Sequence, residues 1–163
     1  MPIINVSLNT ESIANAIEQL KEYGDRVRSL DERVVKRLVD DGVEQAQDLV
    51  PLDTGALMSS IVGESNGKQG VIKTDCDYAA FVEFGTGVIG AAASYPGTLA
   101  EGYEYNGGEH HVILKDGRDG WFFPLDDGSW RFTQGQPTKP FMYDTAQLLA
   151  KAVPQIVEEE LQS

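Results

Sequence analysis

The chain has 163 residues and a mass of 17.8 kDa, a length that fits one domain. Its hydrophobic content of 41% excludes a disordered or collagen-like chain, and its short apolar runs exclude a membrane-spanning helix. The N-terminus lacks the features of a signal peptide, and a single cysteine excludes an intrachain disulfide. The net charge of −13 excludes a broad basic face, so we expect no stable binding to duplex DNA.

The first predicted element is a helix. Ser7, Asn9 and Thr10 offer N-caps, and apolar residues then recur at spacings of three and four from Ile13 to Leu20. We expect Gly24 to end this helix.

A second helix is predicted to follow directly. Ser29 and Glu32 have the spacing of a capping box. A helical stripe of apolar residues then runs from Val34 to Val50, and Pro51 ends it.

The spacing of the apolar residues along the sequence changes after this helix. Residues 61–65 and 71–75 read as strands, and Asn66-Gly67 between them predicts a β-hairpin. Residues 78–84 are apolar and aromatic, and their pattern fits either a strand or a single helical turn.

The second half of the chain is rich in glycine: residues 85–135 hold 11 of the 17 glycines. We expect a long loop over residues 88–110, and then three strands at residues 112–114, 121–123 and 130–133. A last helix begins near Pro140 and is kinked at Pro154.

These elements predict an α+β fold. A small antiparallel sheet packs against the long helix of the N-terminal half and against the C-terminal helix. Residues 1–163 form a single domain, and residues 88–135 form a loop and an extra hairpin inserted into it.

The motifs that could carry chemistry are weak. Gly85 to Gly90 match G-x-G-x-x-G, but Pro96-Gly97 prevents the long helix that a dinucleotide site requires. His110 and His111 would point to opposite faces of a strand and so converge poorly on a metal. The carboxylates on either side of Cys76 disfavour a nucleophilic thiolate. We therefore predict no catalytic residues, no cofactor, no metal and no enzymatic activity.

Three other motifs indicate turns that hold the fold, at residues 51–57, 78–87 and 135–141. In the second, Glu83 lies among aromatic residues. A carboxylate in that setting needs hydrogen-bond donors if it is buried, and we expect those donors to come from the turn at Thr54 and Gly55. The alternative is that Glu83 points into water.

Taken in order, these motifs resemble a family, the gene-product-ten-like tail components of long-tailed double-stranded DNA phages. The resemblance covers residues 30–87 and 136–162. Its matching residues are Pro51, Asp53 to Leu57, Tyr78, Ala79, Phe81 to Gly87, and Pro140 to Met142. The residues that we single out as family-motif or turn positions are Pro51, Asp53, Thr54, Gly55, Leu57, Tyr78, Glu83, Phe84, Gly85, Pro140 and Phe141.

The resemblance implies a structural virion protein of the phage neck, without enzymatic activity, that acts in head–tail joining or tail completion. It implies a ring of copies around the DNA channel, with six copies favoured, that contacts the head connector, the tail tube or both. The protein would be found in the virion, and in the host cytoplasm during assembly. The alternatives left open are an acidic DNA mimic that occupies a host nucleic-acid-binding protein and, as the weakest, an enzyme acting through the glycine-rich loop.

Overall fold

The computed structural model describes residues 10–51, 55–105, 111–125 and 127–162. Its elements confirm the α+β class. In chain order they are α1 (Thr10–Arg28), α2 (Leu30–Leu49), α3 (Ala56–Ser60), β1 (Val62–Ser65), β2 (Gly70–Lys73), α4 (Ala79–Phe84), α5 (Gly87–Ala92), β3 (His111–Ile113), β4 (Asp119–Pro124), β5 (Trp130–Thr133) and α6 (Phe141–Gln162).

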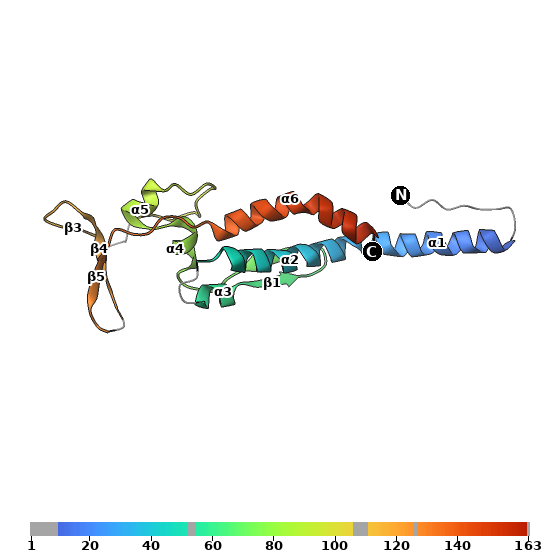
Figure 1. The fold of residues 1–163 in the computed structure, drawn as a ribbon, viewed down its shortest axis with the longest axis horizontal. Coiled ribbons are helices and arrows are strands. Elements are labelled where there is room, and N and C mark those ends of the chain that lie inside the picture. Colours follow the sequence, from blue (N-terminus) through green and yellow to red (C-terminus); the bar gives the residue numbers. More distant parts are fainter. Residues whose placement is uncertain (1–9, 52–54, 106–110, 126, 163) are drawn as a thin grey trace.

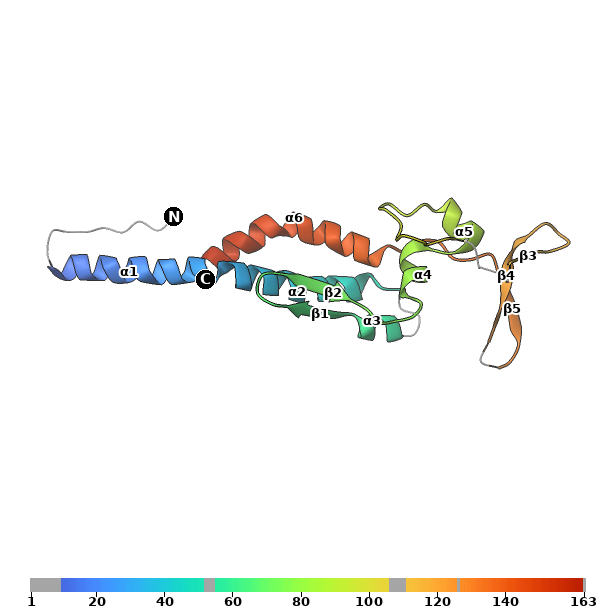
Figure 2. The same ribbon diagram turned by 180° about the vertical axis from the view of Figure 1, so that it is seen from behind.

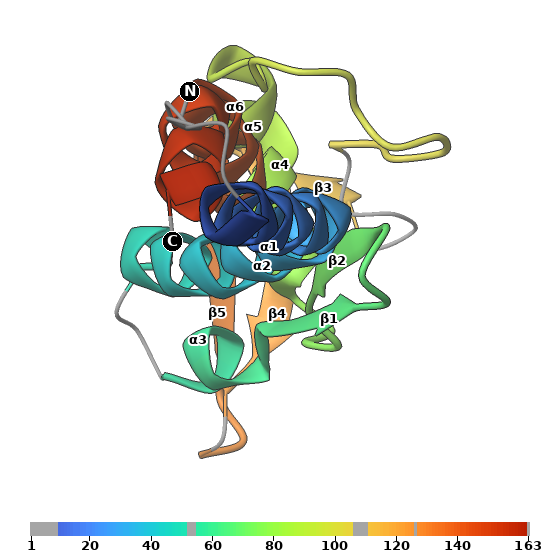
Figure 3. The ribbon, with the colours of Figure 1, turned by 90° about the vertical axis from the view of Figure 1, so that its right-hand side faces the viewer.

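The molecule is elongated, and α2 lies at its centre (Figures 1 and 2). Helix α6 runs along one side of α2, and the β1–β2 hairpin covers another side, as the view along the long axis shows (Figure 3). Helices α4 and α5 follow at one end of α2, with the three-stranded sheet beyond them, whereas α1 projects from the opposite end.

The strands form two separate antiparallel sheets. β1 pairs with β2, with Val62 opposite Lys73 and Ser65 opposite Gly70. The N–H of Asn66 donates to the carbonyl of Gln69, so the turn is centred on Gly67 and Lys68, one residue later than the Asn66-Gly67 pair predicts. The second sheet has the order β3-β4-β5, so the extra hairpin predicted from the sequence is part of a three-stranded meander. The two-stranded sheet is too small to be stable alone and packs against α2.

The core lies where α2, α3, α4 and the start of α6 meet. Its buried residues are Ala46, Val50, Leu57, Ile61, Ala79 and Phe141. Gly42 lets two elements approach α2 closely, because a Cβ atom there would lie 2.3 Å from Ile72 of β2 and 2.8 Å from Leu149 of α6.

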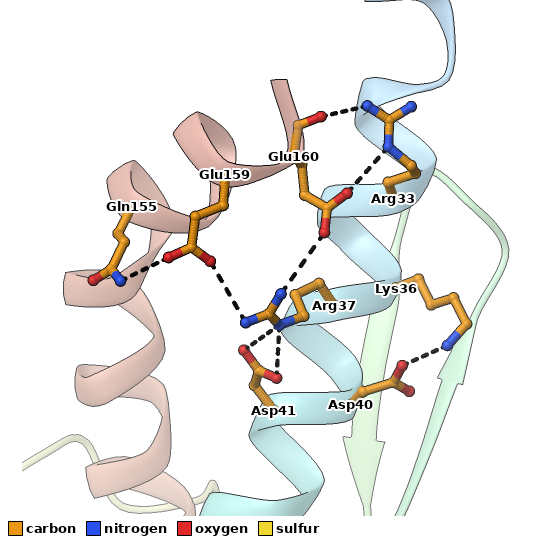
Figure 4. Close-up of polar contacts among 8 residues, drawn as sticks. All are labelled: Arg33, Lys36, Arg37, Asp40, Asp41, Gln155, Glu159 and Glu160. Atoms are coloured by element: carbon orange, nitrogen blue, oxygen red, sulfur yellow. Dashed lines mark hydrogen bonds and ion pairs between the residues drawn. The ribbon is translucent and has the colours of Figure 1, made fainter. Parts of the chain in front are cut away.

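Charged side chains join the far end of α6 to α2 (Figure 4). Arg33 donates to the Glu160 carboxylate at 3.1 Å and also to the Glu160 backbone carbonyl. Arg37 binds Asp41 on its own helix at 3.0 Å and reaches Glu159 at 3.6 Å. Arg33 thus supplies a donor to a carbonyl in the last turn of α6, where carbonyls lack partners within the helix.

Two predictions for the first helices are wrong. α1 continues past Gly24 to Arg28, since one glycine costs a helix only about 1 kcal/mol. Ser29 makes no side-chain cap to α2, and its hydroxyl donates back to the carbonyls of Asp25 and Arg26 instead. α2 therefore follows α1 along nearly the same axis (Figure 1).

The loop predicted over residues 88–110 is also partly wrong, because Gly87–Ala92 form α5. The segment at 78–84, which the pattern left open, is helical. Among the described residues, no helix combines the length and the apolar character needed to cross a membrane.

Candidate functional site around Glu83

Glu83 lies on α4 and is one of the two buried polar residues of the described core, with 6% of its surface exposed. The expectation that this carboxylate is buried is confirmed. A groove of about 470 Å³ between α4 and α6 opens above it, lined largely by apolar and aromatic side chains. An ionised carboxylate in such a place requires several hydrogen-bond donors.

The described donors come from α6 and from a tyrosine. The backbone N–H of Met142 donates to Oε2 of Glu83 at 2.9 Å, and that of Tyr143 donates to Oε1 at 3.0 Å. The hydroxyl of Tyr95 also donates to Oε1, at 3.0 Å. Met142 and Tyr143 lie in the first turn of α6, whose N–H groups have no acceptor within the helix. Glu83 therefore caps α6 from a different helix, with its negative charge at the positive end of the helix dipole.

The predicted donors of Glu83 thus need correction. We expected the turn at Thr54 and Gly55, but the donors that the structure describes are 12 to 60 residues further along the chain. Thr54 itself lies outside the described residues, as does Asp53. Gly55 precedes α3 with a φ of 70°, which glycine adopts without strain.

The extended segment before α6 is fixed against the end of α4. The hydroxyl of Thr138 donates to the carbonyl of Glu83 at 2.6 Å, and the N–H of Lys139 donates to that of Val82 at 2.9 Å. Gln136 pairs with Thr86 in an isolated antiparallel bridge. Together with the Glu83 carboxylate, these bonds set where α6 starts.

The first glycines of the G-x-G-x-x-G motif make this approach possible. Gly85 has a φ of 77°, and a Cβ there would lie 2.7 Å from the Thr138 nitrogen. Gly87 has a φ of 63°, and a Cβ there would lie 2.4 Å from the Gln134 carbonyl oxygen. These glycines therefore serve close contact between two chain segments.

The pocket beside this motif also differs from a nucleotide site. Its volume is about 360 Å³, and it is lined by residues of α5, β3 and β4. The lining contains the carboxylate Asp119, and none of the described residues that line it is a lysine or arginine. A phosphate site would need the opposite charge.

Aromatic side chains surround Glu83 and attach the glycine-rich segment to it. Phe84 contacts Tyr95 and Tyr103, with ring centroids 4.9 and 4.8 Å apart, and Tyr95 also contacts Tyr143. The pKa of Tyr95 is raised well above its ordinary value. Burial is the largest cause, and the hydrogen bond to Glu83 is the second. Sequence reasoning missed these tyrosines. Tyr95 and Tyr103 stand with Tyr105 in a segment otherwise rich in small residues, and this density of tyrosines is the signal that the sequence offers.

The remaining motif residues fall into two groups. Phe141 and Leu57 are both in the core, and Pro140 directly precedes α6, so these residues lie with Glu83 around the junction of α4 and α6. Pro51 follows α2, and Tyr78 precedes α4 and is partly exposed.

The candidate metal and nucleophile residues lie elsewhere. His111 approaches Asp119 at 2.5 Å across the β3–β4 pair, and His110 lies outside the described residues. Cys76 is half-buried and free. Within the part of the chain that the structure describes, no three acidic, histidine or cysteine side chains gather as metal ligands.

The geometry around Glu83 is that of a structural joint. All the described bonds of its carboxylate go to donors of the fold itself, and these donors hold two helices and a tyrosine together.

Comparison with known proteins finds a family that is similar to part of the chain. Residues 14–85, from α1 to the end of α4, match a family of phage tail components. The family is described as Bacteriophage HK97-gp10, putative tail-component. The resemblance found in the sequence is thus confirmed over residues 30–85, which include Glu83. The match ends before α6 and does not reach the second part of the resemblance, residues 136–162. No curated protein and no solved structure matches the chain.

Proposed function

We propose that this protein is a structural subunit of the phage neck that acts in head–tail joining or tail completion. Its copies form a ring around the DNA channel, with six copies favoured, and the ring contacts the head connector, the tail tube or both. The observation that carries this proposal is the match of residues 14–85 to a tail-component family. The protein would reside in the virion and pass through the host cytoplasm during assembly.

The charge and the Glu83 joint support a structural role. A net charge of −13 disfavours adhesion to DNA, so that DNA can pass a ring made of such subunits. The buried bonds of Glu83 fix the start of α6 relative to α4, and a rigid subunit presents the same surfaces in every copy.

The DNA-mimic alternative receives less support. A mimic needs free carboxylates in a regular double row, as phosphates are arranged in DNA. Along the α2–α6 contact, however, Glu160 and Asp41 are paired with Arg33 and Arg37 (Figure 4). Carboxylates neutralised in this way do not present a phosphate-like row.

The proposal is tested by deleting the gene from the phage genome and imaging the particles made in the host. We expect DNA-filled heads and separate tails, and we expect joined virions to return when the protein is supplied from a plasmid. Normal, infectious virions without the protein would overturn the proposal.

A further inference from the structure

The three-stranded sheet carries an apolar face that is open to solvent. In the pairing register, Phe122 stands opposite Phe132 and Pro124 stands opposite Trp130, so these side chains share one face of the sheet with Val112. The Trp130 side chain is 66% exposed, and that of Phe122 is 42% exposed. An aromatic face of this kind normally packs against another layer.

Helix α1 carries a second open apolar surface. Ile13, Ile17 and Leu20 are spaced at four and three residues and so lie on one side of the helix. All three are exposed, and Leu20 is the most exposed of them at 58%. Among the residues that the structure describes, no other helix or strand runs along α1, which projects beyond the end of α6 (Figures 1 and 2).

The two surfaces complement each other but cannot meet within one chain. One is an apolar stripe on a helix and the other is an apolar face of a sheet. In α+β proteins such a stripe packs on such a face, and both surfaces are thereby buried. They lie at opposite ends of the elongated molecule (Figures 1 and 2). A contact between them therefore requires two chains.

Charge opposes contact between two copies least at these two surfaces. Residues 10–28 contain four acidic and three basic residues, and residues 111–135 contain the same numbers, so each segment has a net charge of −1. The other residues carry −11 of the total −13. Two copies repel each other strongly over most of their surfaces, and the two apolar surfaces are where this repulsion is weakest.

We infer that α1 of one copy packs its Ile13, Ile17 and Leu20 stripe on the β3–β4–β5 face, around Phe122 and Trp130, of a neighbouring copy. The contact joins two different surfaces, so it repeats head to tail, and a repeat of this kind closes into a ring when the rotation between copies allows it. The inference rests on the ring proposed above and names the surfaces that build it.

The test uses two variants with matched controls. Leu20→Gln alters the helix surface, and Leu148→Gln makes the same change at an exposed site on α6. Trp130→Thr alters the sheet face, and Val71→Thr is its control at an exposed site on β2. Sedimentation velocity at physiological salt measures the association of each protein, and circular dichroism checks that each is folded. Ile17→Gln replaces Leu20→Gln if that variant unfolds.

We expect the wild-type chain and both controls to associate, and each surface variant alone to remain monomeric. An equal mixture of the Leu20→Gln and Trp130→Thr proteins should form dimers but nothing larger, because one intact helix surface and one intact sheet face remain between them.

Loss of association in only one of the two variants would indicate a contact between like surfaces and would overturn the inference. So would a mixture that stays monomeric, or a wild-type chain that does not self-associate. A chain that stays monomeric but enters virions would refute this contact alone, whereas a chain that associates as described but is absent from virions would refute the proposed function alone.

Discussion

Replacing Glu83 by alanine tests whether the α4–α6 joint stabilises the fold. The substitution removes the acceptor of the Met142 and Tyr143 N–H groups and of the Tyr95 hydroxyl. Leaving a buried donor unpaired costs about 1–3 kcal/mol. With the lower value for each of the three donors, Glu83→Ala should reduce the free energy of unfolding by about 3 kcal/mol. In a chain of this length that corresponds to a fall in Tm of about 6–12 °C.

Two further variants make this measurement specific. Glu83→Gln keeps an oxygen that can accept two of the three bonds but loses the charge at the helix end, so we expect a smaller loss of about 1–2 kcal/mol. Glu101→Ala removes an exposed carboxylate and should leave the stability within about 0.5 kcal/mol of the wild type. Urea unfolding followed by circular dichroism gives all three values. A Glu83→Ala protein as stable as the Glu101→Ala control would refute the reasoning.

Three other outcomes are expected. The pKa of Tyr95 is raised in the folded protein, so above about pH 10 the unfolded chain loses this proton first and stability falls as the pH rises. Tyr95→Phe should weaken that fall, as unfolding at about pH 9 and pH 11 would show, and an unchanged alkaline slope would count against the Tyr95–Glu83 bond. Gly87→Ala should lower the free energy of unfolding by more than about 2 kcal/mol, because the new Cβ would meet the Gln134 carbonyl. Gly102 has a similar φ but open space around it, so Gly102→Ala should lower it by only about 1–2 kcal/mol. Equal losses in the two variants would argue against the close approach at Gly87. A gel shift at about 150 mM salt should show no micromolar binding to duplex DNA, and a clear complex would contradict the charge argument.

Local signals predicted most of the elements. Pro51 lacks the N–H that a continuing helix needs, and the Asn66-Gly67 pair favours a two-residue turn, so the end of α2 and the hairpin could be placed from the sequence. Gly24 misled the prediction because its cost is small compared with the helix formers around it. α5 was missed because Gly87 at its start and Gly90 within it suggested a loop. Both glycines pack closely against residues 134 and 136, and this contact depends on the tertiary fold.

The candidate site was only half predictable. The apolar neighbours of Glu83 in the sequence suggest its burial but leave exposure to water as an alternative. Its partners cannot be found in this way, because Met142 and Tyr143 are about 60 residues away along the chain. The sequence motifs include one end of the joint, residues 78–87, and the segment directly before the other end, residues 135–141. No periodicity or spacing connects a carboxylate with the N–H groups at the start of a distant helix.

The most direct test of the central claim is the location of this protein in purified virions. Cryo-electron microscopy of particles that carry a tagged copy, complemented for infectivity, should show the tag in a ring at the junction between head and tail, coaxial with the DNA channel. Purified, infectious virions that lack the protein, or that carry it scattered over the capsid surface, would contradict the account.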